Sequence, residues 1–291
     1  VPADEMGWRR PEDGLVQHCL FLCDTPKPWP GYHEPDYISG IDMMGLQDWT
    51  FADNLFAGIS GQNGGGRGAI FIWVGSEDVI AERNLIINCD RGICFGNPSG
   101  KYPQVIRGSV RHNWIVGGRN KAIEQSGTQD NEVCHNSIYA TDFDYPRTVV
   151  FSEGSRGARC HHNLVHGRLE VTADSEAQLE ANRLGRLEGC FADPLAGDLR
   201  LTGAARDTVG KGMGAVVLQG HPLHRHPHVP EVDGSGEPSH CEREEQRGDD
   251  EWLPGKGRKL RPQAPDDVQP HEMFAAIALL YSSDKNLTTC R

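Results

Sequence analysis

The chain has 291 residues, 37% of them hydrophobic, and carries a formal net charge of −12. Such a chain can bury the core of one domain and leave a tail, and its acidic balance argues against a nucleic-acid partner, which would be expected to meet a basic surface. The longest uninterrupted apolar stretch is Met273–Tyr281. It is well short of the roughly 18 residues that cross a membrane, so no membrane span is predicted.

One short phrase recurs along the chain with an asparagine as its fourth residue. The copies are Phe51–Phe56, Ala81–Ile86, Val110–Ile115, Val133–Ile138, Cys160–Val165 and Leu179–Leu184. An earlier copy, Val16–Phe21, has Cys19 in the asparagine position, and consecutive copies are 19 to 35 residues apart. A unit of this length cannot bury its apolar face alone and must stack on its neighbours, so the repeat predicts a solenoid.

A second segment, rich in β-branched and aromatic residues and bounded by glycine, follows most of the phrases. These segments are residues 69–73, 92–96, 122–126, 148–153 and 168–172, and no convincing helical period occurs between Phe51 and Val171. Short strands without helices predict a parallel β-helix whose coils lie about 4.8 Å apart. Equivalent asparagines are then expected to hydrogen-bond from coil to coil as a ladder, and to occupy the left-handed corner of each turn.

The phrases resemble the right-handed parallel β-helix repeats of the pectin-lyase-like superfamily. The segments Phe191–Pro194, Gly197–Leu201 and Gly210–Gly212 are similar to the closing coil of many bacterial members. The resemblance covers about residues 14–213 and implies an all-β, right-handed parallel β-helix. It also implies a secreted or periplasmic protein that works on carbohydrate. It does not name the reaction, because this fold hosts lyases, hydrolases, epimerases, adhesins and binding modules.

Two regions of different character are expected. Residues 1–213 form the β-helix domain, which is expected to lack its N-terminal cap and some coils, because Val1 begins close to a repeat phrase without a start residue. Residues 214–291 lose the repeat and contain a histidine- and proline-rich run. They are predicted to be an irregular, disordered tail, for which a reading-frame error near Gly214 is one explanation. The protein is expected to be a monomer.

The nine cysteines do not form an evident metal-ligand pattern. Cys89, Cys134, Cys160 and Cys190 fall in repeat strands, where a free thiol serves as a small core residue. A disulfide between Cys19 and Cys23 stays open as an alternative.

Candidate site residues follow from aligning the second segments, with Ile70, Ile93, Ile123, Val150 and Leu169 taken as inward. One outward row is then Phe71, Cys94, Glu124, Phe151 and Glu170, and the other is Trp73, Gly96, Ser126, Glu153 and Thr172. Glu124 and Glu153 are predicted catalytic acids, several ångströms apart as in glycosidases. Phe71, Trp73 and Phe151 are predicted to stack on sugar rings. The alternative is that all of these are ordinary solvated strand positions.

Basic residues fall at loop edges around the same coils. Arg91, Lys121 and Arg147 are predicted to take part in catalysis, because a uronate lyase needs a cation to neutralise the substrate carboxylate and a base to remove the C5 proton. No metal site is assigned. A Ca²⁺ ion at Asp142 and Asp144 stays open, and no cofactor is required by the sequence.

The sequence departs from the catalytic motifs of the known enzyme families with this fold. It lacks the Trp-Ile-Asp-His phrase of pectate lyases, the Asn-Thr-Asp and Gly-His-Gly set of polygalacturonases and the Asp-Pro-His motif of mannuronan epimerases. The expectation is therefore a polysaccharide-active enzyme, lyase-like or hydrolase-like, that acts on a glycan in which uronates are one option. The alternative is a non-catalytic glycan-binding or surface-structural protein.

Overall fold

The structure is a computed structural model that describes residues 10–23, 37–98, 100, 103–117 and 120–205. Its regular structure there consists of β-strands and three short 3-10 helices, which confirms the all-β prediction. Within these residues no helix is long and apolar enough to cross a membrane. The predicted tail, residues 214–291, and the Gly210–Gly212 part of the closing motif lie outside the described residues.

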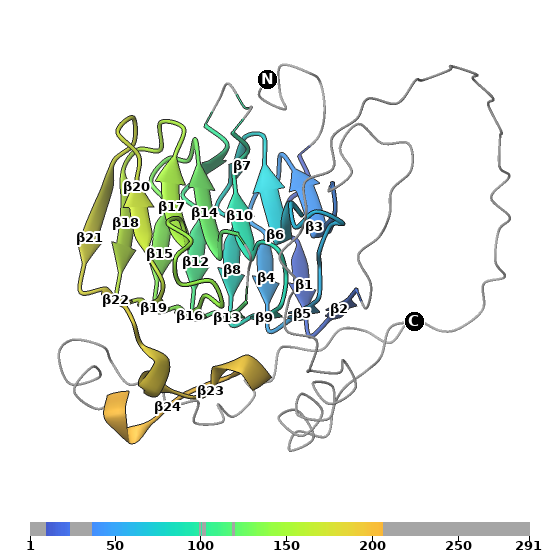
Figure 1. The fold of residues 1–291 in the computed structure, drawn as a ribbon. Helices are drawn as coiled ribbons and strands as arrows, with labels where there is room; N and C mark the ends of the chain where they lie inside the picture. The colour runs from blue at the N-terminus through green and yellow to red at the C-terminus, as the bar shows by residue number, and fades with distance from the viewer. Residues whose placement is uncertain (1–9, 24–36, 99, 101–102, 118–119, 206–291) are drawn as a thin grey trace, which may run out of the picture. The chain divides into compact units, whose positions relative to one another are not determined.

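Three parallel sheets are built by strands that recur in the same order along the chain (Figure 1). The first sheet contains β1 (Leu15–Gln17), β4 (Thr50–Ala52), β8 (Ile80–Glu82), β12 (Ser109–Arg111), β15 (Glu132–Cys134), β18 (Ala158–His161) and β21 (Ala177–Glu180). The second contains β2 (Leu20–Leu22), β5 (Leu55–Ala57), β9 (Leu85–Ile87), β13 (Trp114–Val116), β16 (Ser137–Tyr139), β19 (Leu164–His166) and β22 (Arg183–Gly185).

The third sheet contains β3 (Ser39–Met44), β6 (Gly68–Trp73), β10 (Ile93–Phe95), β14 (Ile123–Ser126), β17 (Val149–Ser152) and β20 (Leu169–Val171). A short extra pair, β7 (Ser76–Glu77) and β11 (Val105–Ile106), is also parallel. Every strand of the three large sheets pairs with its counterpart one coil away, so the chain is a parallel β-solenoid.

The core lies between the three sheets. It consists of rows of inward side chains, in which each coil contributes one residue to each row. In the third sheet Ile70, Ile93, Ile123 and Val149 are register partners from coil to coil and are at most 1% exposed. In the second sheet Phe21 stacks on Phe56 with ring centroids 4.5 Å apart. Such stacking buries a coil's apolar face only against its neighbours, as expected for a solenoid.

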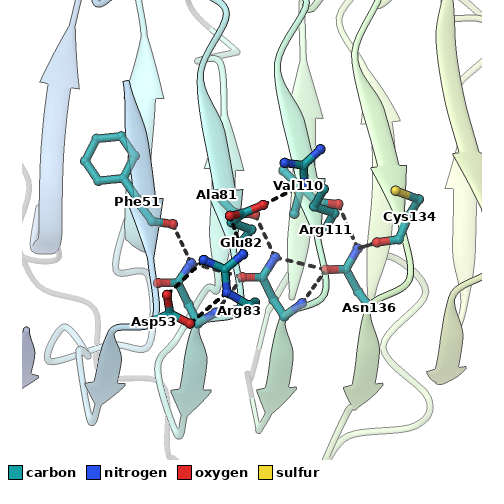
Figure 2. Close-up of polar contacts among 11 residues, drawn as sticks. Phe51, Asp53, Ala81, Glu82, Arg83, Val110, Arg111, Cys134 and Asn136 are labelled. Atoms are coloured by element: carbon teal, nitrogen blue, oxygen red, sulfur yellow. Dashed lines mark hydrogen bonds and ion pairs between the residues drawn. The ribbon is translucent and has the colours of Figure 1, made fainter. Parts of the chain in front are cut away.

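The predicted asparagine ladder is confirmed. The amide Nδ2 of each ladder asparagine donates to the side-chain oxygen of the next, at 3.0 Å from Asn84 to Asn113 and at 3.0 Å from Asn113 to Asn136. The same amide also donates to a backbone carbonyl of the preceding coil, as from Asn136 to Val110 (Figure 2). At the end of the row, the backbone N–H of Cys19 donates to Asn54 Oδ1. Cysteine therefore occupies the asparagine position, but its side chain does not continue the ladder of side-chain hydrogen bonds.

The left-handed residue of each corner is the one before the asparagine, which corrects the expectation that asparagine itself adopts this conformation. Residues with positive φ at this corner are His18, Asp53, Arg83, His112, His135, His162 and Ala181. Their φ values lie between 49° and 56°. The asparagines therefore serve the turn through hydrogen bonds alone, and their side chains face inward while the left-handed residues face outward.

Charged side chains connect the coils outside the ladder. Arg83 makes two hydrogen bonds to Asp53, at 2.8 and 2.9 Å, and also pairs with Glu82. Arg111 then donates to Glu82 at 2.7 Å (Figure 2). These contacts alternate in sign along the coil stack, which avoids repulsion between side chains spaced one strand apart.

The closing motif does not form another coil. Residues after β22 form η1 (Glu188–Cys190), β23 (Phe191–Asp193), η2 (Pro194–Ala196), β24 (Asp198–Leu201) and η3 (Gly203–Ala205), and β23 pairs antiparallel with β24. Phe191 and Leu199 pack with Val116 and Leu164, and Val116 and Leu164 belong to the second sheet. Hence this segment covers the outer face of the second sheet. It does not cover the last coil, where Leu179 and Leu184 are 50% and 42% exposed.

Candidate functional site

The candidate site is the outer face of the third sheet. Strand register places one residue of each coil in a single row on this face: Asp42, Phe71, Cys94, Glu124, Val150 and Glu170. The sequence predicted Phe71, Cys94, Glu124 and Glu170 in this row. Four of the six residues, Phe71 to Val150, are at most 2% exposed, so most of the row is covered instead of facing solvent.

The predicted alignment of β17 is wrong by one residue. Ile123 pairs with Val149, not Val150, and Gln125 pairs with Phe151. A shift of one residue moves a side chain to the opposite face of a sheet. Phe151 consequently lies in the core with 0% exposure and cannot stack on a sugar.

Glu153 also falls outside the predicted row. The residue that pairs with Ser126 is Ser152, and Glu153 follows the strand in a left-handed turn with φ 55°. It is exposed, and no contact joins it to Glu124 among the described residues. The predicted pair of catalytic carboxylates is therefore not held together by any shared partner.

Glu124 is the centre of a buried ion cluster with two of the predicted basic residues. Arg91 Nη1 lies 3.3 Å from Glu124 Oε2, and the ammonium of Lys121 contacts Oε1. The side chains of Glu124, Arg91 and Lys121 are 1%, 16% and 13% exposed. Since both carboxylate oxygens are occupied by cations, Glu124 orients Arg91 and Lys121 and does not present a free oxygen.

The cluster carries an uncompensated positive charge. Arg91 and Lys121 contribute two positive charges against the single negative charge of Glu124. The Nε atom of Arg91 is buried and has no hydrogen-bond partner among the described residues. A buried donor without a partner costs free energy that an added acceptor would recover. The cluster is thus suited to bind an anion.

Arg147 extends the basic row by one coil. Arg91, Lys121 and Arg147 each stand two residues before the strand positions Ile93, Ile123 and Val149, which are register partners. Arg147 is bound by Glu170 through two hydrogen bonds of 2.9 and 3.2 Å, and this contact raises the pKa of its guanidinium. Coils in this geometry place equivalent residues about 4.8 Å apart.

Two further ionisable groups line the cluster. Cys94 lies in the row next to Glu124, and burial, with Glu124 beside it, raises the pKa of its thiol far above the usual range. The thiol is therefore protonated and is not a nucleophile. The hydroxyl of Tyr145 donates to Asn120 Oδ1 at 2.7 Å, and burial raises the pKa of this phenol.

Aromatic side chains lie at the other end of the same face. Trp73 stacks on Phe71 with centroids 5.3 Å apart, and the guanidinium of Arg67 lies 5.2 Å from the Phe71 centroid. Phe71 is consequently covered and cannot contact a sugar, contrary to prediction. Trp73 is partly exposed and donates to Asp42 at 2.9 Å, while Tyr37 donates to Asp42 at 2.8 Å. Tyr37 was not predicted, because it precedes β3 outside any repeat.

The acids proposed for Ca²⁺ do not converge. Asp142 accepts from the backbone N–H of Asp144 at 3.1 Å, and Asp144 pairs with Arg168 at 3.3 Å. Both acids are exposed. Two carboxylates used in a turn and an ion pair fall short of the six to eight oxygens that calcium takes. Among the described residues, the metal-ligand side chains that come together are instead Cys134, His135 and His161, which belong to β15, its following corner and β18.

No family model matches the chain, and comparison with curated proteins and with solved structures also finds no match.

Proposed function

We propose that this chain is a β-helix protein of the pectin-lyase-like kind, secreted or periplasmic, whose third sheet binds an acidic polysaccharide on its outer face. The observation that carries the proposal is the basic row of Arg91, Lys121 and Arg147 on one face of a chain with a net charge of −12. An acidic chain would repel a polyanion unless cations gather locally. The repeat spacing of this row suits a polymer with a carboxylate on successive sugars.

The polar contacts of the face support this ligand class. The excess positive charge at Glu124 and the unpartnered Nε of Arg91 favour a carboxylate. Arginine binds carboxylates through two parallel hydrogen bonds, as Arg147 already does with Glu170. Trp73 and Tyr37 add partly exposed rings on the same face, which suit the apolar side of a sugar.

A uronate lyase is the second candidate. It is favoured by Asn120, whose side-chain oxygen accepts from both the Tyr145 hydroxyl and the Lys121 backbone N–H, at 2.7 and 3.0 Å. Asn120 thus holds the Tyr145 phenol beside the basic row, where the charges of Arg91 and Glu124 act on it. A phenol is a group able to move a proton at a sugar carbon or its leaving oxygen. In such a reaction Glu124 would be a positioning residue for Lys121. A two-carboxylate hydrolase has no comparable support.

Binding is expected to depend on Arg147. We expect the full chain to bind polyuronates such as polygalacturonate or alginate, and not neutral polysaccharides. Arg147→Gln is expected to weaken polyuronate binding about tenfold, because the variant loses one charged hydrogen bond to the ligand. Affinity electrophoresis or calorimetry against a panel of glycans measures this effect.

Arg156→Gln is the matched control, because Arg156 is similarly exposed, at 52% against 46% for Arg147, but pairs with Glu176 elsewhere. Equal loss in both variants would mean general charge attraction, and no binding to any polyuronate would refute the proposal. Lyase activity is tested on the same samples through the ultraviolet absorbance of unsaturated products. New reducing ends without this absorbance would indicate hydrolysis.

A further inference from the structure

A cluster of imidazoles and one thiol lies at the corner between the first and second sheets, away from the basic row. His112, His135 and His162 occupy the left-handed corner position on three consecutive coils. Their rings stack, with centroids 5.1 Å apart between His112 and His135 and 5.2 Å apart between His135 and His162. His161 stands edge-on to His135 at 5.8 Å. The structure describes six histidines, and four of them lie in this cluster; the other two are His18 and His166.

Cys134 faces this cluster and not the core. It was predicted to be a core thiol, and it is buried, at 4% exposure. Its register partners on the outer side of the first sheet are Arg111 and His161, whereas the inward row contains Val133 and Cys160. The thiol therefore has imidazole and carboxylate neighbours in place of aliphatic ones.

A hydrogen bond to a carboxylate orients the His161 ring in the way typical of metal-binding histidines. Its Nε2 lies 3.0 Å from Glu132 Oε1, so Nε2 carries the proton and donates it to the carboxylate. The lone pair is then on Nδ1, where it accepts a hydrogen bond from Nδ1–H of His162 at 2.9 Å, and a metal ion would replace that hydrogen bond. Metal-binding histidines commonly donate their second ring nitrogen to a carboxylate in this way.

The three donor atoms are already close to one another. Cys134 Sγ and one ring nitrogen each of His135 and His161 all lie within 4.8 Å of one another. Ligand atoms around a tetrahedral zinc ion are separated by about 3.3–3.5 Å, as follows from bond lengths of about 2.0–2.3 Å. Small side-chain rotations close this difference.

We propose that Cys134, His135 and His161 form a binding site for a divalent transition metal of the Zn²⁺ class, with Glu132 positioning His161. A thiolate with two imidazoles is the donor set that zinc favours and that Ca²⁺ and Mg²⁺ do not. Three protein ligands leave one coordination position for water or a small anion. The thiol gives up its proton on binding, as thiols do when they coordinate a metal.

The backbone that carries the ligands is held rigidly by the asparagine ladder. Asn136 donates to the carbonyl of Cys134 and Asn163 to that of His161, both at 3.1 Å. Ligands fixed on strands and braced by a second layer of hydrogen bonds meet the requirement of a preorganised site.

Titration of the metal-free full chain with Co²⁺ tests the site. We expect one equivalent to produce the ultraviolet band of thiolate-to-cobalt charge transfer together with the visible bands of a tetrahedral complex, and Zn²⁺ to abolish both. Cys134→Ser is expected to remove the charge-transfer band, and His161→Gln to lower the affinity more than about 100-fold. Glu132→Gln should weaken binding about 10- to 100-fold, as expected for a positioning residue.

Controls separate this site from other donors in the chain. Cys19→Ser and His18→Gln change the equivalent corner at the far end of the row and should leave the titration unchanged. A variant with His221, His224, His226 and His228 replaced by glutamine should also retain the band. Far-ultraviolet circular dichroism with chelator checks that each variant is folded. A titration without a thiolate band, or a band that survives Cys134→Ser, overturns the proposal.

Discussion

Glu124→Gln is expected to destabilise the protein by about 3 kcal/mol, because it leaves two cations in a buried cluster without their counter-ion. Arg91 and Lys121 both contact the Glu124 carboxylate, and both side chains are less than one fifth exposed. Glutamine has nearly the same shape as glutamate, so the loss of stability would come from the missing charge and not from a change in side-chain volume. Denaturant unfolding measures the change. The sequence placed Glu124 in an outward row, and a substitution at an exposed strand position would change stability by less than about 1 kcal/mol. The 1% exposure of Glu124 removes that premise.

Two further variants identify the cause of this loss. Glu170→Gln breaks the exposed pair with Arg147 and is expected to change stability by less than about 1 kcal/mol. Lys121→Met in the Glu124→Gln background should restore part of the stability, because it removes one of the two unpaired cations. If Glu124→Gln costs no more than Glu170→Gln, the cluster is open to solvent and Glu124 is free to act on a substrate.

Asn113→Leu is expected to cost about 3 kcal/mol, since leucine fits the volume but makes none of the ladder hydrogen bonds. Asn113 Nδ2 donates to Ala81 O at 2.9 Å and to Asn136 Oδ1 at 3.0 Å. Its Oδ1 accepts from both the backbone and the side chain of Asn84, at 3.0 Å each. All of these groups are buried, so they find no water in exchange. The thermal midpoint and denaturant unfolding both report the loss.

Asn182→Leu is the matched control at the end of the ladder. Asn182 accepts from Asn163 and donates to Cys160 O at 2.7 Å, but it is partly exposed, and within the described residues it donates to no further asparagine. It should therefore cost clearly less than Asn113→Leu. Equal costs for the two variants would mean that the ladder contributes only through local turn contacts and not through its continuity.

The basic row shows how far a repeat can position residues before a structure is known. Arg91 and Lys121 were predicted near Glu124 because they fall at loop edges around the same coils. Each stands two residues before a register-paired strand position, and register pairing fixes such positions from coil to coil. The same reasoning failed for Phe151 and Glu153. In residues 148–153 two adjacent valines and a phenylalanine fit either face, so the apolar pattern does not select the register, and a single-residue shift reverses every side chain.

By itself, the sequence determined the parallel β-solenoid and its asparagine ladder, because both depend on short-range patterns repeated coil after coil. Only the tertiary structure decided which outward residues are exposed. Glu124 and Phe71 lie on the outer face, yet loop side chains cover them, and no strand pattern contains that information. The same is true of Cys134 and His161, whose 27-residue separation carries no ligand spacing until the register of β15 and β18 brings them together. Burial and convergence are properties of chain segments distant in sequence, so they appear only once the coils are stacked.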